Sequence, residues 1–182
     1  MMKNSLESVL NDLKKAKENV FLEFKKAGKN VPASIWETYS AFCNTVGGTI
    51  ILGIEEKKEE NLILGVENPD DIIKNIWNTL NNKNKVSHNT LEDSDLYKLE
   101  IEDKTIIVMN IKEVPNSEKP VYLNGDLKEI YVRQGEADKK ATFDEIRNFI
   151  AILINPWIVI PPVIIEISLD LSHLFAGCIF SI

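Results

Sequence analysis

The chain has 182 residues and a mass of 20.7 kDa, which fits one domain of ordinary size. Apolar residues make up 44% and charged residues 27% of the chain, a composition that argues against intrinsic disorder, a collagen-like repeat and a free coiled coil. The net charge is −7, which excludes a protein that coats nucleic acid with a uniformly basic surface but allows a local basic face.

Two further features of the composition concern location and redox chemistry. The chain has two cysteines, too few for a disulfide framework or a zinc cluster. Residues 1–28 are rich in Lys and Glu and contain no continuous apolar stretch of the kind that a signal peptide needs. We therefore expect a reducing, cytoplasmic setting.

The first elements alternate between helix and strand. Apolar residues at helical spacing predict a helix over 5–18, and alternating residues predict a short strand over 20–25. A second helix is predicted to begin near Pro32 and to end at Gly47-Gly48, because glycine accepts the left-handed conformation of a helix exit. The compact apolar run 49–54 predicts a buried strand.

Residues Asn44 to Gly48 superficially suggest a phosphate-binding loop. They lack the Gly-Lys-Ser/Thr ending of such a loop, and here the glycines end a helix rather than precede one. We therefore expect a structural turn in which Asn44 bonds nearby backbone, and we expect Gly53 to let the strand pack closely.

The middle of the chain contains paired strands around one helix. Residues 62–66 are predicted to form a hairpin with the preceding strand, and 70–82 a helix with acids at its positive end. After a polar loop, 96–102 and 105–111 form a clear predicted hairpin.

The remaining elements complete the predicted domain. Short strands are expected over 121–123 and 129–133, joined by a turn at 124–126, and a helix capped by Thr142 follows to Phe149. This mixture predicts a single α+β domain with a mixed, mostly antiparallel sheet flanked by helices.

Three motifs occur in a fixed order along the chain. Residues 18–25 read ENVFLEFK, residues 40–54 read SAFCNTVGGTIILGI, and 119–135 contain KPVY and YVRQG. This series resembles the Schlafen AlbA-type domain, a family often labelled DNA-binding. The resemblance covers residues 5–150 and leaves 151–182 as a hydrophobic C-terminal tail.

The resemblance also implies a candidate catalytic site. Some Schlafen members cut tRNA or rRNA with three carboxylates, and the matching positions here are Glu18, Glu23 and Glu56, with Glu55 adjacent. The third position departs from the family, which has aspartate there. Phosphodiester hydrolysis uses hard divalent cations that neutralise phosphate charge and activate water. Mg²⁺ or Mn²⁺ held by these four glutamates is therefore the implied cofactor.

The same glutamates have a structural alternative. Glu18 and the Glu55-Glu56 pair can be solvated charges at the ends of secondary-structure elements. Glu23 lies between two apolar residues of a strand, where it can pair with Lys25 or Arg133. The sequence does not choose between Glu23 and a phosphate as the partner of Arg133.

Lysines are concentrated at the N-terminus. Residues 1–30 contain seven lysines and four acids, a local charge of +3. Lysines bind phosphates as point charges and release counterions, although a solvated helix face is the alternative interpretation. The candidate nucleic-acid contacts are Lys14, Lys15, Lys17, Lys25, Lys26, Lys29 and Arg133.

We therefore predict a nucleic-acid-binding domain with RNA or DNA as its partner, in a regulatory or other nucleic-acid-associated role. A divalent-metal-dependent endoribonuclease and a protein-interaction module are the alternatives. Nuclease members of the family clasp substrate between two related lobes, and this chain has one. The resemblance thus raises a homodimer as an alternative to a monomer.

The C-terminal residues differ from the rest of the chain. Residues 148–182 contain no Lys or Arg. Prolines interrupt the apolar stretch 149–165, which argues against a membrane-spanning helix, whereas 163–171 alternates like a strand. A strand packed on the body, a hydrophobic or membrane-associated tail, and an aberrant end from truncation or frameshift remain open.

Overall fold

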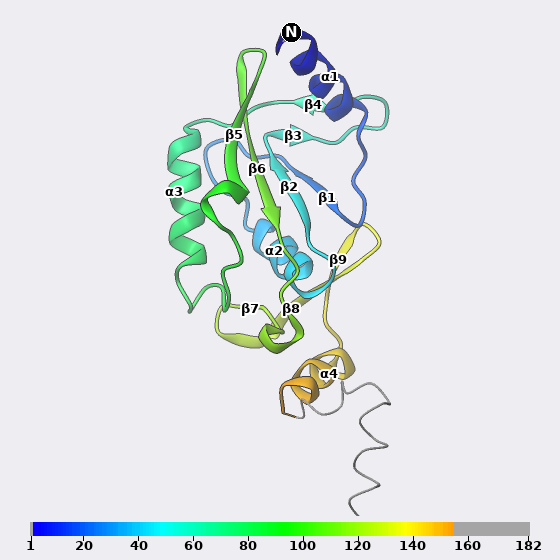
Figure 1. Cartoon of the computed structure of the whole chain (residues 1–182), viewed down its shortest axis with the longest axis vertical. Helices are drawn as coiled ribbons and strands as arrows, with labels where there is room; N and C mark the ends of the chain where they lie inside the picture. Colours follow the sequence, from blue (N-terminus) through cyan, green and yellow to red (C-terminus); the bar gives the residue numbers. More distant parts are fainter. Residues whose placement is uncertain (1, 155–182) are drawn as a thin grey trace, which may run out of the picture.

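The main sheet is mixed and has four strands (Figure 1). A computed structural model describes residues 2–154 of the chain. The sheet order is β1 (Leu22–Lys25), β2 (Gly48–Leu52), β6 (Lys104–Ile111) and β5 (Leu96–Ile101). β1 and β2 are parallel, whereas β2 pairs with β6 and β6 with β5 in antiparallel register. The predicted α+β class with a mostly antiparallel sheet is confirmed.

Two smaller sheets flank the main one. β3 (Ile54–Glu55) pairs with β4 (Leu62–Ile63), as the predicted hairpin requires. The second small sheet has the order β7 (Tyr122–Leu123), β8 (Asp126–Gln134) and β9 (Ala137–Lys140). The sequence predicted β7 and the second half of β8 but not β9.

Four α-helices accompany the sheets within residues 2–154. In Figure 1, α1 (Met2–Lys15) lies at one end of the molecule and α4 (Phe143–Ile154) at the other. α3 (Pro69–Leu80) lies along the β5 side of the main sheet, and α2 (Ile35–Asn44) lies behind the sheet. Two short 3₁₀ turns, η1 (Asp93–Asp95) and η2 (Asn116–Glu118), complete the described elements.

The core is built around α2. Eight of the ten residues of this helix are buried, as is expected for a helix enclosed on several sides. The helix exit matches the sequence prediction, since Gly47 has φ +70° and its N–H donates to the Phe42 carbonyl at 2.9 Å. A Cβ on Gly47 would lie 2.8 Å from the Ile111 oxygen, so this position requires glycine for two reasons.

Gly53 divides what the sequence predicted as one strand. Its φ is +96°, and a Cβ there would lie 2.9 Å from the carbonyl carbon of Gly65. The Gly53 carbonyl accepts bonds from the N–H groups of Leu64 and Gly65 at 2.8 and 2.9 Å. The close approach expected at this glycine is confirmed. The backbone bend there separates β2 from β3 and aims the following residues, including Glu55 and Glu56, toward α1 and β1.

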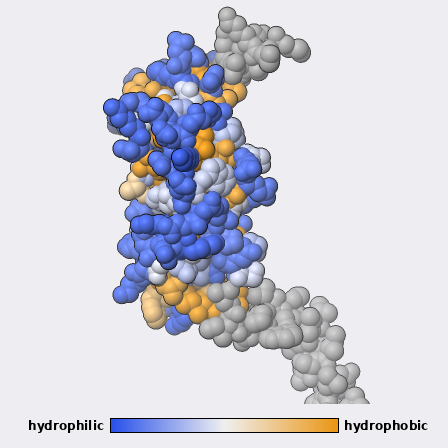
Figure 2. Space-filling model, turned by 90° about the vertical axis from the view of Figure 1, so that its left-hand side faces the viewer, coloured by the Kyte–Doolittle hydropathy of each residue, from blue (hydrophilic) through white to orange (hydrophobic). Residues whose placement is uncertain are grey.

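The C-terminal end of the described region is apolar. Phe143 of α4 is 78% exposed, and a hollow of about 280 Å³ beside it is lined by apolar atoms of the helix. Figure 2 shows a mostly hydrophilic face on which apolar residues gather at the α4 end. Within residues 2–154, no helix is long and apolar enough to cross a membrane. The predicted strand over 163–171 lies outside the described residues.

Candidate nucleic-acid interface

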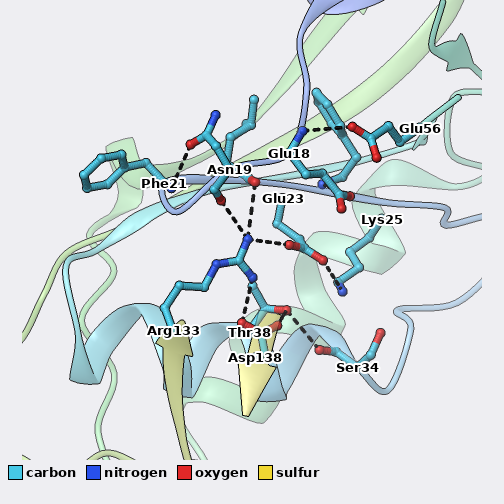
Figure 3. A network of polar contacts seen from close by, with 12 residues as sticks. Glu18, Asn19, Phe21, Glu23, Lys25, Ser34, Thr38, Glu56, Arg133 and Asp138 are labelled. Atoms are coloured by element: carbon cyan, nitrogen blue, oxygen red, sulfur yellow. Dashed lines mark hydrogen bonds and ion pairs between the residues drawn. The ribbon is translucent and has the colours of Figure 1, made fainter. Parts of the chain in front are cut away.

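A buried arginine connects β8 to β1 (Figure 3). The Arg133 side chain is fully buried and lies over the Phe42 ring, with its guanidinium carbon 5.0 Å from the ring centroid. Its Nη2 donates to Glu23 Oε2 and to the Asn19 carbonyl, both at 2.8 Å, and its Nη1 donates to Asp138 Oδ1 at 2.8 Å. The structure thus places Arg133, a candidate phosphate contact, inside the protein rather than on its surface.

Glu23 forms ion pairs with two cations. Besides its bond to Arg133, its Oε1 accepts from Lys25 Nζ at 2.7 Å, so both structural pairings that the sequence left open are present. Asp138 completes the network by accepting from the Thr38 hydroxyl at 2.5 Å. Two cations therefore face two carboxylates, and the attraction between them offsets the free energy that is lost when these four charged groups leave water. Burial tends to lower the pKa of Arg133, but Asp138 and Glu23 outweigh it and the net shift is upward.

Glu18 covers the outer edge of β1. Its Oε1 accepts from the Phe24 N–H at 3.0 Å. The carbonyls of Phe21 and Lys25 accept from the N–H groups of Thr49, in the adjacent strand β2, and of Gly53, which follows β2. Because backbone groups alternate sides along a strand, the Phe24 N–H points to the opposite, outer edge. Burial raises the pKa of Glu18, and the charges of Glu23 and Glu56 add to this shift, while the bond from Phe24 opposes it.

The turn after β3 brings Glu56 to the same place. Glu56 Oε1 accepts from the Glu18 N–H at 2.9 Å. Its neighbour Glu55 instead pairs with Lys57 at 3.0 Å and with Lys26 at 3.4 Å. The bond from Lys57, with a smaller contribution from Lys26, lowers the pKa of Glu55. Glu18 and Glu56 are therefore brought together, whereas Glu55 is held by lysines.

The four glutamates do not form a metal-ligand set in this arrangement. Glu23 is occupied by Arg133 and Lys25, and Glu55 by two lysines. Within residues 2–154, no group of three or more His, Cys, Asp or Glu side chains is arranged to hold a metal ion. Binding of a metal ion by these glutamates would require at least one of the ion pairs to break.

A surface pocket lies beside Glu18 and Glu56. It has a volume of about 480 Å³ and is formed by three lysines and three glutamates. Lys17 is the only one of the predicted lysines that lines it. Lys57 and Lys58 were not predicted, although they directly follow the Glu55-Glu56 pair in the sequence. The lining residues are Lys17, Glu18, Glu56, Lys57, Lys58 and Glu136.

The other predicted lysines are distributed over several ion pairs. Lys25 bonds to Glu23, and Lys14 and Lys29 lie 3.8 Å from Glu60 and Glu67. The Lys26 side chain is 64% exposed in its pair with Glu55, and Lys15 is exposed near the end of α1. The predicted lysines therefore take part in separate contacts, although Lys14, Lys17 and Lys26 all contact the segment 55–60.

Comparison with known proteins relates the chain to one family and to several solved structures. No curated protein matches the chain. The N-terminal domain of a protein related to the ATP-dependent DNA helicase RecG, from Nitrosomonas europaea, is 20% identical over 76% of this chain and 92% of that chain, with a TM-score of 0.47. The DIP2311 protein from Corynebacterium diphtheriae is 15% identical, with a TM-score of 0.52. This match covers 82% of the present chain but only 29% of the DIP2311 chain, and it supports the fold alone.

The family comparison is more direct. Residues 18–142 match the family described as Schlafen, AlbA_2, a segment that lies inside the predicted domain and contains all three sequence motifs. This segment includes β1, the buried Arg133 and every residue that lines the pocket beside Glu18 except Lys17. Because the match spans well over half of the 182 residues, the protein belongs to the Schlafen AlbA_2 family.

Proposed function

We propose that the protein binds nucleic acid, RNA or DNA, with backbone phosphates at Lys17, Lys57 and Lys58. The observation that carries this proposal is the pocket in which three lysines converge from two segments about forty positions apart in sequence. Lysines bind phosphates as point charges and release counterions from the strand. Family membership supports the same proposal, because the Schlafen AlbA-type resemblance implies nucleic-acid association.

The lysines of the pocket are held in place. Lys17 Nζ donates to the Lys57 carbonyl, and the Lys57 N–H donates to Asn61 Oδ1 at 3.1 Å. Asn61 is buried and donates to the Leu13 carbonyl at 3.0 Å, which fixes the turn to α1. The Lys17 side chain and the backbone that carries Lys57 are therefore positioned before a phosphate arrives, which reduces the entropy lost on binding.

Three glutamates of the pocket oppose the approach of phosphate. Two of them are already engaged by the backbone, since Glu18 accepts from the Phe24 N–H and Glu56 from the Glu18 N–H. The three lysines of the pocket remain able to attract phosphate. We therefore expect weak binding that depends strongly on salt rather than tight sequence-specific binding.

A charge-matched pair of variants tests the proposal. Fluorescence anisotropy with a labelled RNA and a labelled DNA of the same sequence, at low salt, measures affinity for wild type, Lys57→Ala/Lys58→Ala and Lys83→Ala/Lys85→Ala. Lys83 and Lys85 are also exposed but lie outside the pocket. We expect the first double variant to lose affinity and the second to retain it. Absence of wild-type binding, or an equal loss in both double variants, overturns the proposal.

A metal-dependent endoribonuclease is the second candidate. It is favoured by the contact between Glu18 and Glu56, which brings two of the three matched acids into the pocket with the lysines. Incubation with tRNA and Mg²⁺ or Mn²⁺, beside Glu23→Ala and Glu56→Gln, tests it. Glu56→Gln retains an oxygen for the Glu18 N–H and serves as the variant that preserves folding. Equal degradation by all three proteins excludes this activity.

The oligomeric state bears on both candidates. If two copies clasp one substrate, light scattering should give twice the monomer mass for the protein alone, or twice the monomer mass plus that of one RNA for the complex. A protein-interaction module is the outcome favoured if nucleic acid fails to bind at low salt while a partner copurifies.

A further inference from the structure

An exposed aromatic ring stands three residues after Glu18. Phe21 is 56% exposed, although burying such a side chain typically stabilises a protein by about 1.5–3 kcal/mol relative to exposure. Figure 3 shows its ring pointing away from the polar network below it. The neighbouring residues of β1 behave differently, because Glu23 and Phe24 are both buried.

The backbone that carries this ring is fixed. The Phe21 N–H donates to Asn19 Oδ1 at 2.9 Å, and its carbonyl accepts from the Thr49 N–H at 2.8 Å. The turn itself is closed by reciprocal bonds between Asn19 and Leu22 at 3.1 and 3.3 Å. Arg133 holds the turn from below through its bond to the Asn19 carbonyl. The ring therefore projects from a rigid turn whose geometry is set by a buried ion-pair network.

The ring is also close to the lysine pocket. Three peptide units separate Phe21 from Glu18, a lining residue, so their Cα atoms are at most about 11 Å apart. Figure 3 shows the Phe21 ring and Glu56 on opposite sides of the network, so a strand whose phosphates lie on Lys17 and Lys57 would bring a base to the ring farther along its length. Bases stack on exposed aromatic side chains regardless of sequence, because every base has a π-face.

We propose that Phe21 stacks against an unpaired base, which makes single-stranded nucleic acid or an unpaired loop the preferred ligand. In a duplex the bases are stacked on one another and only their edges are accessible, so an isolated ring on a rigid turn cannot stack on a base. This inference rests on the proposed nucleic-acid binding and adds the class of ligand. The fixed backbone of the turn favours stacking, because little backbone entropy is lost when the ring contacts a base.

The test compares one labelled single strand of about a dozen nucleotides with the duplex of the same sequence, within the roughly 4–16 nucleotides that a small binding fold covers. Anisotropy is measured with the full chain at one low salt concentration. We expect wild type to prefer the single strand. Phe21→Ala should weaken single-strand binding by about 5- to 150-fold, the equivalent of losing one base–aromatic stack, and leave duplex binding unchanged. Phe21→Tyr should retain the preference.

Tyr97→Ala is the matched control. Tyr97 is 43% exposed and lies on β5, at the opposite edge of the main sheet from β1. Equal effects of Phe21→Ala and Tyr97→Ala, or an equal loss of single-strand and duplex binding in Phe21→Ala, overturn the inference. If wild type binds nucleic acid, Lys57→Ala/Lys58→Ala loses this binding and Phe21→Ala keeps it in full, the proposed function stands and the stacking role fails. If wild type binds neither ligand, both fail.

Discussion

At the scale of single residues, the matched glutamates divide into structural and accessible groups. Glu23 neutralises a buried arginine, whereas Glu18 and Glu56 line a pocket open to solvent. The sequence identified all three positions and named Arg133 as one potential partner of Glu23. It could not show which partner is used, because that depends on the distance between β1 and β8. It also could not reveal the bond from Phe24 to Glu18, because the direction of that N–H depends on parallel pairing of β1 with β2.

Replacing the buried arginine should be strongly destabilising. In Arg133→Met, Glu23 and Asp138 lose their shared partner while remaining inside the protein. Breaking a buried ion pair in this way typically costs about 3–5 kcal/mol. Urea denaturation measures the change in the free energy of unfolding. The triple variant Arg133→Met/Glu23→Gln/Asp138→Asn removes the unpaired charges and should recover part of the loss. A change below about 1 kcal/mol in the single variant would contradict the structural role, since ordinary surface substitutions fall within about ±0.5 kcal/mol.

At the scale of elements, the sequence predicted the helices and the main hairpin well because their apolar periodicity is strong. β9 was missed because Ala137–Lys140 lacks an apolar alternation. This strand exists through its pairing with β8, where Asp138 lies opposite Arg133. β9 therefore supplies one of the two carboxylates that contact the buried arginine. Its pairing with β8 is stabilised by a cross-strand charge pair rather than by alternating apolar residues, so the sequence pattern did not predict it.

The division between β2 and β3 gives an element-scale prediction. Gly53→Ala places a Cβ against the Gly65 backbone at a residue with φ +96°, where strain typically costs about 1–3 kcal/mol. We expect a lower free energy of unfolding and, because the proposed phosphate contacts Lys57 and Lys58 follow this bend, weaker nucleic-acid binding. Gly28→Ala is the control, since a Cβ there meets nothing within 4 Å. Denaturation and anisotropy of the two variants check both effects, and equal stability of the two would show that the bend tolerates a side chain.

At the scale of the whole molecule, the net charge of −7 limits how nucleic acid can approach. Long-range attraction is weak, so affinity depends on the local cations of the pocket. If three lysines contact phosphates of a single strand, the slope of log K against log salt should be about −2. Lys57→Ala/Lys58→Ala should reduce it by about 1.4, in proportion to the two contacts removed. Anisotropy titrations at several salt concentrations give these slopes, and a slope near zero would indicate binding that does not involve phosphates.

The edge of β1 has a consequence for assembly. Leu22 uses both of its backbone groups in its bonds with Asn19, and Glu18 occupies the Phe24 N–H. A further strand therefore cannot pair along this edge without displacing these contacts. The main sheet is closed on one side, which confines strand addition to this sheet to the β5 edge. Substituting Glu18 with a residue that has no acceptor would open the closed edge. Such a variant would be prone to self-association as well as altered at the pocket.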